Sequence, residues 1–150
     1  MSTKRIGRQT LVLNSPPVVI SHASVVGSKE GEGPLKSSFD YISGDSYFGK
    51  DSWEKAESAM QSLAFSTACS KASIEPADIN YLFAGDLLNQ CIASAFSMRD
   101  LGIPFFGLYG ACSTMAESLS LAAMSIDAPP TKIHTQEELL WHFAEIAERK

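Results

Sequence analysis

The chain has 150 residues, of which 45% are hydrophobic, and its 12 lysines and arginines face 17 aspartates and glutamates, for a formal net charge of −5. This length suits one domain that buries a core without disulfides or metal, and the composition is that of an ordinary globular protein, not a disordered one. The sequence lacks the clustered basic residues with interleaved aromatics that bind a phosphate backbone, so we expect no nucleic-acid partner.

The cysteines and the N-terminal segment indicate the kind of cellular compartment in which the protein resides. Cys69, Cys91 and Cys112 are odd in number and lack the spacing of a metal site or a disulfide framework, which indicates free thiols in a reducing compartment. The charged first ten residues are not followed by the apolar region of a signal peptide, and every later apolar run is too short to span a membrane. The sequence therefore predicts a soluble protein.

The first fifty residues predict short strands followed by a loop. Two runs rich in aliphatic residues, 11–13 and 18–20, flank a proline pair and are typical of strands or a hairpin edge. From Ser28 to Lys50 the sequence turns to Gly, Ser, Asp and Lys, and its hydrophobic periodicity disappears. A loop of this length in a compact domain often lies at a site or an interface.

Helices and strands alternate in the middle of the chain. Asp51 and Glu54 have the spacing of a capping box at the start of a helix. The expected elements are a helix over 52–71, a buried strand over 79–84, a helix over 89–100, a strand over 105–109 and a helix over 113–126. This order predicts an α/β fold in which helices are layered on a mostly parallel mixed sheet with right-handed crossovers.

The last part of the chain, residues 128–150, changes in character. A proline pair at 129–130 ends the preceding helix, and Thr135 with Glu138 forms a second capping-box pattern. The residues after this pattern place apolar side chains on one stripe, which predicts an amphipathic helix that packs on the domain or on a partner. We therefore divide the chain into a domain over 1–127 and a linker with a C-terminal helix over 128–150.

Cys112 is the first candidate for chemistry. It follows Gly110-Ala111 and precedes Ser113-Thr114, so a sharp turn from strand to helix would expose its sulfur at a helix N-terminus. Backbone amides and the helix dipole stabilise a thiolate at such a position. A working thiolate also needs a base. The chain has three histidines, and the sequence around them marks none of them as that base. A nucleophile and a small residue packed in a turn both stay open, the inert residue being the commoner case.

The segment AGDLLNQ, residues 84–90, is the second candidate. It ends a predicted strand with Asp86, Asn89 and Gln90, which can bind a ligand carboxylate or a cation, or cap the following helix. The acidic residues lack the alternation of a calcium loop. Because ligands of open α/β sheets bind beyond the carboxyl ends of the strands, Asp86 and Cys112 both fall at the expected edge.

Several segments together resemble a known family. GRQTLVLNSPPVVISHASVVGSKEGEGPLKSSFD, SWEKAESAM, AGDLLNQ, IPFFGLYGACSTMAESL and LAAMSID resemble the stage V sporulation protein AD (SpoVAD) family of the thiolase-like superfamily, through most of residues 7–127. The combination of AGDLLNQ with GACST is specific, whereas GACS alone marks only the wider superfamily. The resemblance implies a thiolase-like half-domain and a role in loading dipicolinic acid (pyridine-2,6-dicarboxylic acid), with calcium, into the developing spore.

The resemblance also implies roles for residues and partners. Cys112 matches the nucleophile position of the superfamily and, in a family repurposed for binding, would line a ligand pocket without catalysis, together with Asp86, Asn89 and Ser113. No cofactor is implied. The expected location is the forespore or spore, peripheral to the inner spore membrane, with the membrane proteins of dipicolinate transport as partners. Two other interpretations stay open: a remnant of a condensing enzyme with Cys112 as acyl acceptor, and a scaffold or interaction module.

The chain departs from the family in its second half. Thiolase-like proteins pair two similar halves, and the second supplies catalytic His and Asn residues and much of the pocket. Here the sequence stops at residue 150, and 128–150 does not resemble the family's continuation. We expect a truncated, frameshifted or rearranged copy whose exposed sheet face favours a homo-oligomer, with the tail helix covering part of that face.

Overall fold

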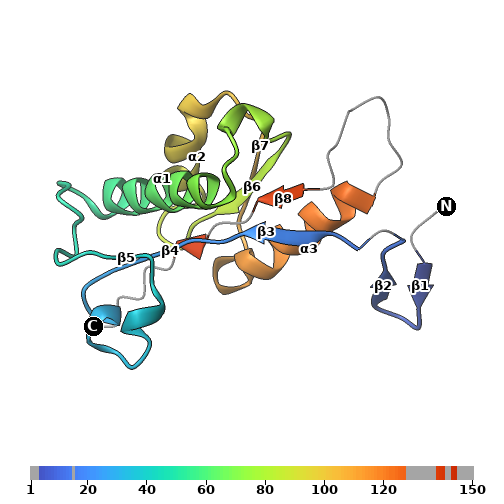
Figure 1. The fold of residues 1–150 in the computed structure, drawn as a ribbon, viewed down its shortest axis with the longest axis horizontal. Helices are drawn as coiled ribbons and strands as arrows, with labels where there is room; N and C mark the ends of the chain where they lie inside the picture. The colour runs from blue at the N-terminus through green and yellow to red at the C-terminus, as the bar shows by residue number, and fades with distance from the viewer. Residues whose placement is uncertain (1–3, 15, 128–137, 141–142, 145–150) are drawn as a thin grey trace.

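The computed structural model describes residues 4–14, 16–127, 138–140 and 143–144 (Figure 1). It begins with an antiparallel hairpin of β1 (Lys4–Ile6) and β2 (Thr10–Val12). Figure 1 shows this hairpin standing away from the other elements, and its apolar side chains, such as Leu11, are accordingly exposed.

The remaining strand pairs are all parallel in the described part of the chain. Strand β3 (Val18–Ser21) pairs with β8 (Glu138–Leu140), and β4 (Ser24–Val26) lies between β5 (Tyr41–Ile42) and β9 (Phe143–Ala144). Strands β6 (Leu82–Gly85) and β7 (Phe105–Leu108) form a pair of their own. The α/β class with mostly parallel pairing is confirmed, although the described hydrogen bonds divide the strands among four small sheets.

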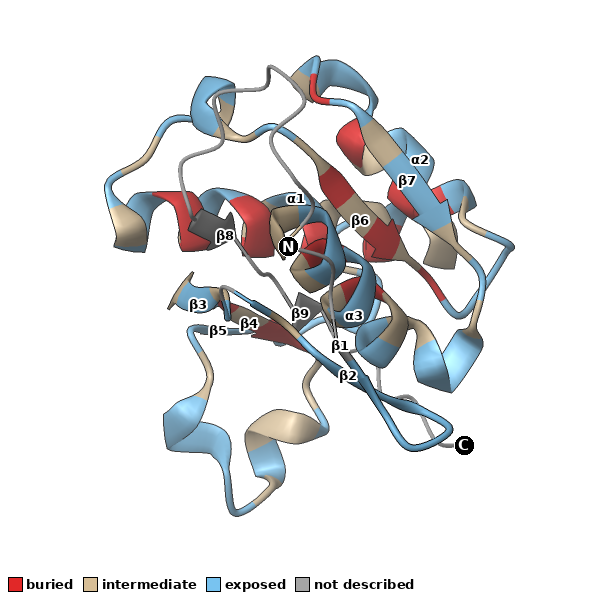
Figure 2. Ribbon diagram, turned by 90° about the vertical axis from the view of Figure 1, so that its right-hand side faces the viewer, coloured by how far each residue is buried: buried red, intermediate tan, exposed pale blue. Residues whose placement is uncertain are grey.

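In the described part of the chain, three α-helices pack against these strands. Helix α1 (Trp53–Ala72) packs on β3, β4 and α2 (Ile92–Met98), while α3 (Thr114–Asp127) packs on β6 and β7 (Figures 1 and 2). Single 3-10 turns lie at Glu30–Glu32, Lys36–Ser38, Pro76–Asp78, Arg99–Leu101 and Ala111–Ser113. In the described residues, no helix combines the length and the apolar character that crossing a membrane requires.

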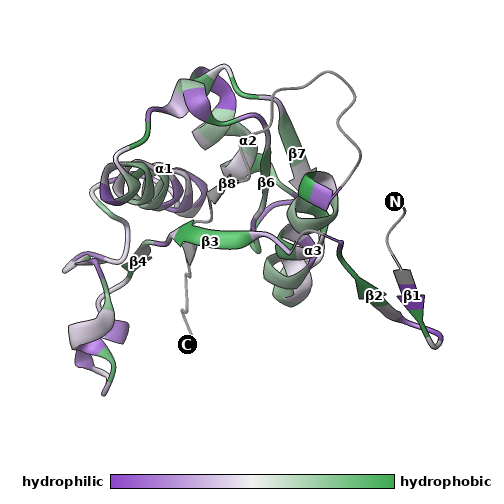
Figure 3. Cartoon of the chain, turned by 45° about the vertical axis from the view of Figure 1, so that its right-hand side comes forward, coloured by the Kyte–Doolittle hydropathy of each residue, from purple (hydrophilic) through white to green (hydrophobic). Residues whose placement is uncertain are grey.

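The core lies along one side of α1. Small and apolar side chains recur there at intervals of three and four residues, which places them on one face: Ala56, Met60, Ala64, Phe65, Ala68 and Cys69 are all buried. Phe65 and Cys69 pack with Leu82, Met98 and Ile103, whereas Met60 and Ala64 pack with Val25. Cys69 is therefore a core residue, and burial raises the pKa of its thiol. Figure 3 shows the apolar character of the strands beside this helix.

The helices predicted over 52–71 and 113–126 are confirmed to within one residue at each end, but two details of the prediction are wrong. Helix α1 is capped by Ser52, whose hydroxyl accepts a hydrogen bond from the Lys55 amide at 3.3 Å, and not by Asp51. The helix predicted over 89–100 starts only at Ile92, because residues 86–91 form a loop. Strands β1, β4 and β5 were not predicted, since two or three residues are too few to show a period.

The predicted amphipathic tail helix is not found where the tail is described. Residues Glu138–Leu140 and Phe143–Ala144 are strands, and the rest of the predicted helix and its linker lie outside the described residues. The stretch ELLWHFA is apolar enough to suit a helix face or a buried strand, and β3 and β4 offer it unpaired backbone groups. Pairing with these strands thus overrides the helical pattern, while the domain boundary at residue 127 stays a prediction.

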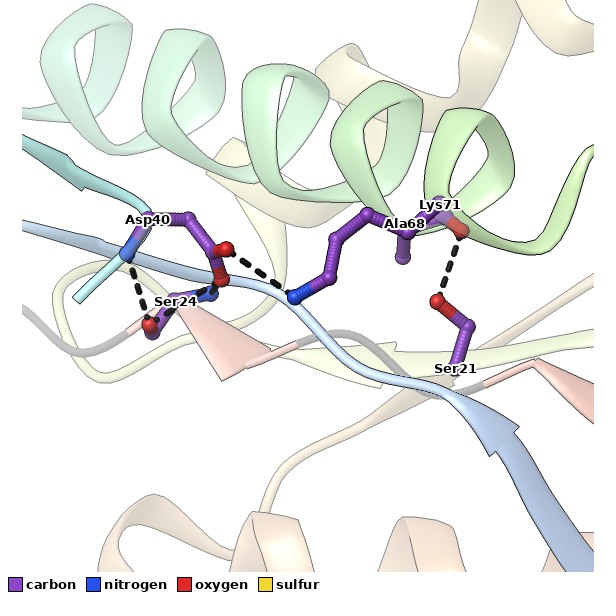
Figure 4. Close-up of polar contacts among 5 residues, drawn as sticks. All are labelled: Ser21, Ser24, Asp40, Ala68 and Lys71. Carbon is purple, nitrogen blue, oxygen red and sulfur yellow. Dashed lines mark hydrogen bonds and ion pairs between the residues drawn. The ribbon is translucent and has the colours of Figure 1, made fainter. Parts of the chain in front are cut away.

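The long loop over 28–50 is tied to the core by Asp40. Its carboxylate accepts hydrogen bonds from the Ser24 amide at 2.9 Å and from Nζ of Lys71 at 2.9 Å (Figure 4). Burial by itself would raise the pKa of Asp40, but these hydrogen bonds outweigh it and hold that pKa below its ordinary value. The contact joins the residues before β5, the start of β4 and the last turn of α1.

We expect Lys71→Met to lower the free energy of unfolding by roughly 0.5–1 kcal/mol at neutral pH, since the ion pair is partly exposed and water screens it. The pKa of Asp40 is depressed in the fold, so this contribution is present above its ordinary value of 3.8 and lost as the pH falls through the lower folded value. Urea unfolding at several pH values measures the effect. Lys55→Met, which breaks an ion pair with the more exposed Asp51, is the control and should change stability less.

Candidate functional site

The two predicted site segments leave the same edge of one strand pair. Strands β6 and β7 are parallel and in register from Leu82 opposite Phe105 to Gly85 opposite Leu108. Asp86 follows the first strand directly, and Cys112 follows the second after a three-residue turn. The strand pairing thus places AGDLLNQ and GACST side by side, as the sequence predicted.

Gly85 permits a close approach at this edge. A Cβ atom at position 85 would overlap the backbone carbonyl oxygen of Leu108 and would lie 2.7 Å from Cγ2 of Thr114. The end of β6 is therefore packed against both the end of β7 and the first residue of α3. Glycine alone lacks the side chain that would push these three elements apart.

Asp86 organises the loop that comes after it. The side chain is buried, and its Oδ1 accepts hydrogen bonds from the amides of Asn89 at 3.3 Å and Cys91 at 3.1 Å. Its Oδ2 accepts from the amide and the hydroxyl of Ser94, at 3.0 and 3.1 Å. The carboxylate thus satisfies free amides at the start of α2, the capping role that the sequence left open beside ligand binding.

Unusual backbone conformations flank the edge. Gln90, Cys91 and Ala111 have positive φ angles of 53°, 70° and 48°, which non-glycine residues adopt at a cost. The thiol of Cys91 also donates to the carbonyl oxygen of Leu108 at 2.8 Å, so the loop after β6 is bonded to the end of β7. Burial, and then the charge of Asp86, raise the pKa of Cys91, which makes this thiol a structural donor.

Cys112 and Ser113 lie on the outside of the turn before α3, where both are exposed. The hydroxyl of Ser113 is 2.8 Å from the Gly110 carbonyl oxygen and 2.9 Å from Oε1 of Glu117. Glu117 folds back over Gly110, since a Cβ there would touch its carboxylate. The thiol of Cys112 is therefore accessible, and the alternative of a packed turn residue does not describe it.

Glu57 is the residue that the sequence analysis missed. It lies on the buried face of α1, only 4% exposed, and its Oε2 has no hydrogen-bond partner among the described residues. Burial and the nearby charge of Asp86 raise its pKa to about 7, although the Leu87 amide donates to it. A signal existed in the sequence, because Glu57 and Gln61 are polar residues at an i, i+4 spacing within the apolar stripe.

Gln61 extends this buried polar cluster to α2. Its Nε2 donates to the hydroxyl of Ser94 at 3.2 Å, and its Oε1 accepts from the hydroxyl of Ser97 at 3.0 Å. Ser94 is also bonded to Asp86, so a continuous chain of hydrogen bonds links α1, α2 and the end of β6. This buried cluster forms the inner side of the site. The exposed side of the site is formed by Asn89, Cys112 and Ser113.

These features define an α/β protein with a candidate ligand site at the carboxyl edge of a parallel strand pair. The sequence profile described as Stage V sporulation protein AD (SpoVAD) matches residues 7–139. Stage V sporulation protein AD of Bacillus subtilis (strain 168) is 39% identical over 124 residues, which is 83% of this chain and 37% of that protein. The chain belongs to the stage V sporulation protein AD family.

The matched region corrects the expected end of the family resemblance and shows how much of the relative this chain covers. It extends to residue 139, beyond the end at 127 that the motifs indicated, so residues 128–137 and the first two residues of β8 fall within the family match. The chain spans little more than a third of the length of the Bacillus subtilis relative.

We expect Gly85→Ala to destabilise the protein by roughly 1–3 kcal/mol, because the new methyl group meets backbone that cannot move freely. Urea unfolding followed by circular dichroism measures the loss. Gly44→Ala is the matched control, since a Cβ at position 44 has open space around it. Equal effects of the two substitutions would contradict the close packing of β6, β7 and α3.

Glu57→Gln should make stability less dependent on pH. The raised pKa of Glu57 means that the folded state holds the proton more tightly, so stability falls as the pH rises from 4.5 to about 7 and then levels off. The glutamine variant should lack this fall and be more stable by roughly 1–3 kcal/mol at pH 8. Thermal unfolding between pH 5 and pH 8 tests the prediction, and a variant that parallels the wild type at every pH would contradict it.

Proposed function

We propose that this chain takes part in sporulation as a dipicolinate-binding protein and that its ligand contacts the exposed side of the β6–β7 edge. The proposal rests chiefly on one observation: the two motifs that are specific in combination, AGDLLNQ and GACST, meet at this edge. Membership in a sporulation family supports the cellular setting. A thiolase-like architecture for the complete family fold is part of the same proposal.

Three exposed side chains are suited to a pyridine dicarboxylate. The amide of Asn89 can donate to a carboxylate oxygen, and the hydroxyl of Ser113 can do so once it turns away from Gly110 and Glu117. Cys112 offers a small, polarisable contact for the ring. The N-terminus of α3 adds a favourable dipole for an anion. Asp86, whose oxygens are occupied by four donors, acts in this proposal by holding the loop and not by touching the ligand.

The charge of the site favours a calcium complex over the free dianion. Segments 86–92 and 109–117 contain acidic residues but no lysine or arginine. The carboxylate of Glu117, 2.9 Å from the Ser113 hydroxyl, would repel a free dicarboxylate. Calcium bound to the dicarboxylate removes that repulsion and can accept Glu117 as a further oxygen ligand.

We propose that binding at this site is not catalytic. An acyl transfer at Cys112 would need a base to activate the thiol, and no histidine occurs in segments 82–92 and 105–117. The exposure of Cys112 supports one alternative, a condensing-enzyme remnant in which the thiol accepts an acyl group. Mass spectrometry after incubation with an acyl thioester decides between them, because an acylated Cys112 would support the alternative.

The proposed setting is the spore, at the periphery of its inner membrane and beside the membrane proteins of dipicolinate transport. We also propose self-association through the β6–β7 face. Phe106, 48% exposed, stacks on Phe83 with ring centroids 4.9 Å apart and lies 5.9 Å from the ring of Tyr81. A partly exposed aromatic cluster of this kind is typical of an interaction surface.

Calorimetric titration with dipicolinate, with and without calcium, tests the proposal. We expect saturable binding that is stronger with calcium, and we expect Asn89→Ala and Cys112→Ala each to weaken it by several-fold without loss of fold. Asp86→Ala should weaken binding and also lower the free energy of unfolding, because four donors lose their acceptor.

Ser120→Ala is the matched control, since Ser120 is exposed on α3 and its hydroxyl bonds only its own helix, to the Ala116 carbonyl oxygen, in the described contacts. This variant should bind like the wild type. Absence of binding by a folded wild-type sample, or full affinity in both Asn89→Ala and Cys112→Ala, would overturn the site.

A further inference from the structure

The buried cluster around Glu57 contains a second carboxyl group that the proposed ligand site does not use. Glu57 and Asp86 are two buried carboxyl groups, the charge of Asp86 acts on Glu57, and only Asp86 is saturated with donors. Asp86 accepts four hydrogen bonds, whereas Oε2 of Glu57 accepts none from the described residues. A buried pair of this kind is stable while one member carries a proton.

Among the described residues, the charged groups near Glu57 do not include a cation that would stabilise its ionised form. On its own helix the nearest charge is that of Glu54, which is also negative, and Lys55 is paired with Asp51. Strands β3, β4 and β9 and helix α2, which pack on α1, contain no Asp, Glu, Lys, Arg or His within their bounds. The next charge after α2, Arg99, is bonded to Asp100, and Cys91 is the remaining titratable group at its start.

The two carboxyl groups stand on elements of unequal rigidity. Glu57 belongs to a 20-residue helix whose face is packed in the core. Asp86 begins a loop whose next four residues, 87–90, are exposed and which contains Gln90 and Cys91 in the left-handed region. Repulsion between the two groups is therefore relieved at lower cost by movement of the loop than by movement of α1.

We propose that Glu57 is a proton-binding switch that controls the loop over residues 86–91: with Glu57 protonated the loop is held on Asp86, and ionisation of Glu57 loosens it. Gln61, one turn after Glu57 on α1, donates to Ser94, and Ser94 donates to Asp86, so a hydrogen-bonded path joins this face of α1 to the loop. Asn89, at the exposed end of the loop, changes position with the switch. The coupling does not depend on which ligand the site binds.

Amide NMR of the labelled wild-type chain between pH 5.5 and 8.5 tests the switch. We expect the amide signals of Leu87, Asn89, Cys91 and Ser94 to shift with one common midpoint near 7, together with the carboxyl carbon of Glu57. Hydrogen-exchange protection of the Asn89, Cys91 and Ser94 amides, corrected for the intrinsic pH effect, should fall several-fold above that midpoint.

Two variants sharpen the result. Glu57→Gln keeps the shape of the side chain without the titrating group, and it should abolish the shifts and keep the protection high at every pH. Glu54→Gln, one turn earlier on α1, should retain the transition. The switch is overturned if the wild-type loop amides do not respond to pH, if their response persists in Glu57→Gln, or if the Glu57 carboxyl titrates at a different midpoint. This last comparison uses the wild type alone, so it holds even if a variant fails to fold.

Discussion

The carboxylate of Asp86 is the contact on which the site depends. It stands at the end of a buried strand and gathers donors from residues 89, 91 and 94, so that one side chain sets the path of the loop and the start of α2. Hydrogen bonds to a charged acceptor are stronger than neutral ones, particularly in the interior. Burial raises the pKa values of Glu57 and Cys91, and the charge of Asp86 raises them further, so this carboxylate shapes the electrostatics of the cluster as well as its geometry.

Much of the site was predictable because it depends on local sequence and on parallel pairing. Strands β6 and β7 are short apolar runs that end at polar or small residues, and parallel pairing brings the segments after both strands to one edge. Cys112 could not be assigned from sequence, since a turn of small residues can bury or expose a thiol. The structure exposes it, with Ala111 in the left-handed region and the Glu117 carboxylate folded back against Gly110.

Two other features needed the fold. The helical period of α1 identifies its buried face, but it does not show that Glu57, on that face, would be exposed to the charge of Asp86. The tail was misjudged for a different reason: capping and amphipathic patterns are local, whereas β8 and β9 depend on unpaired backbone groups offered by strands far away in sequence. Tertiary pairing overrides helix propensity in such segments.

The pairing of β3 with β8 has a consequence for how the chain folds. Val18 pairs with Glu138, and these residues are 120 positions apart, so the ladder closes a loop that includes most of the molecule. Contacts of such long range slow folding. Strands β3 and β4 therefore stay unpaired with β8 and β9 while the intervening helices form. During synthesis on the ribosome, β3 and β4 emerge long before β8 and β9, and their open edges are then free to pair with other chains.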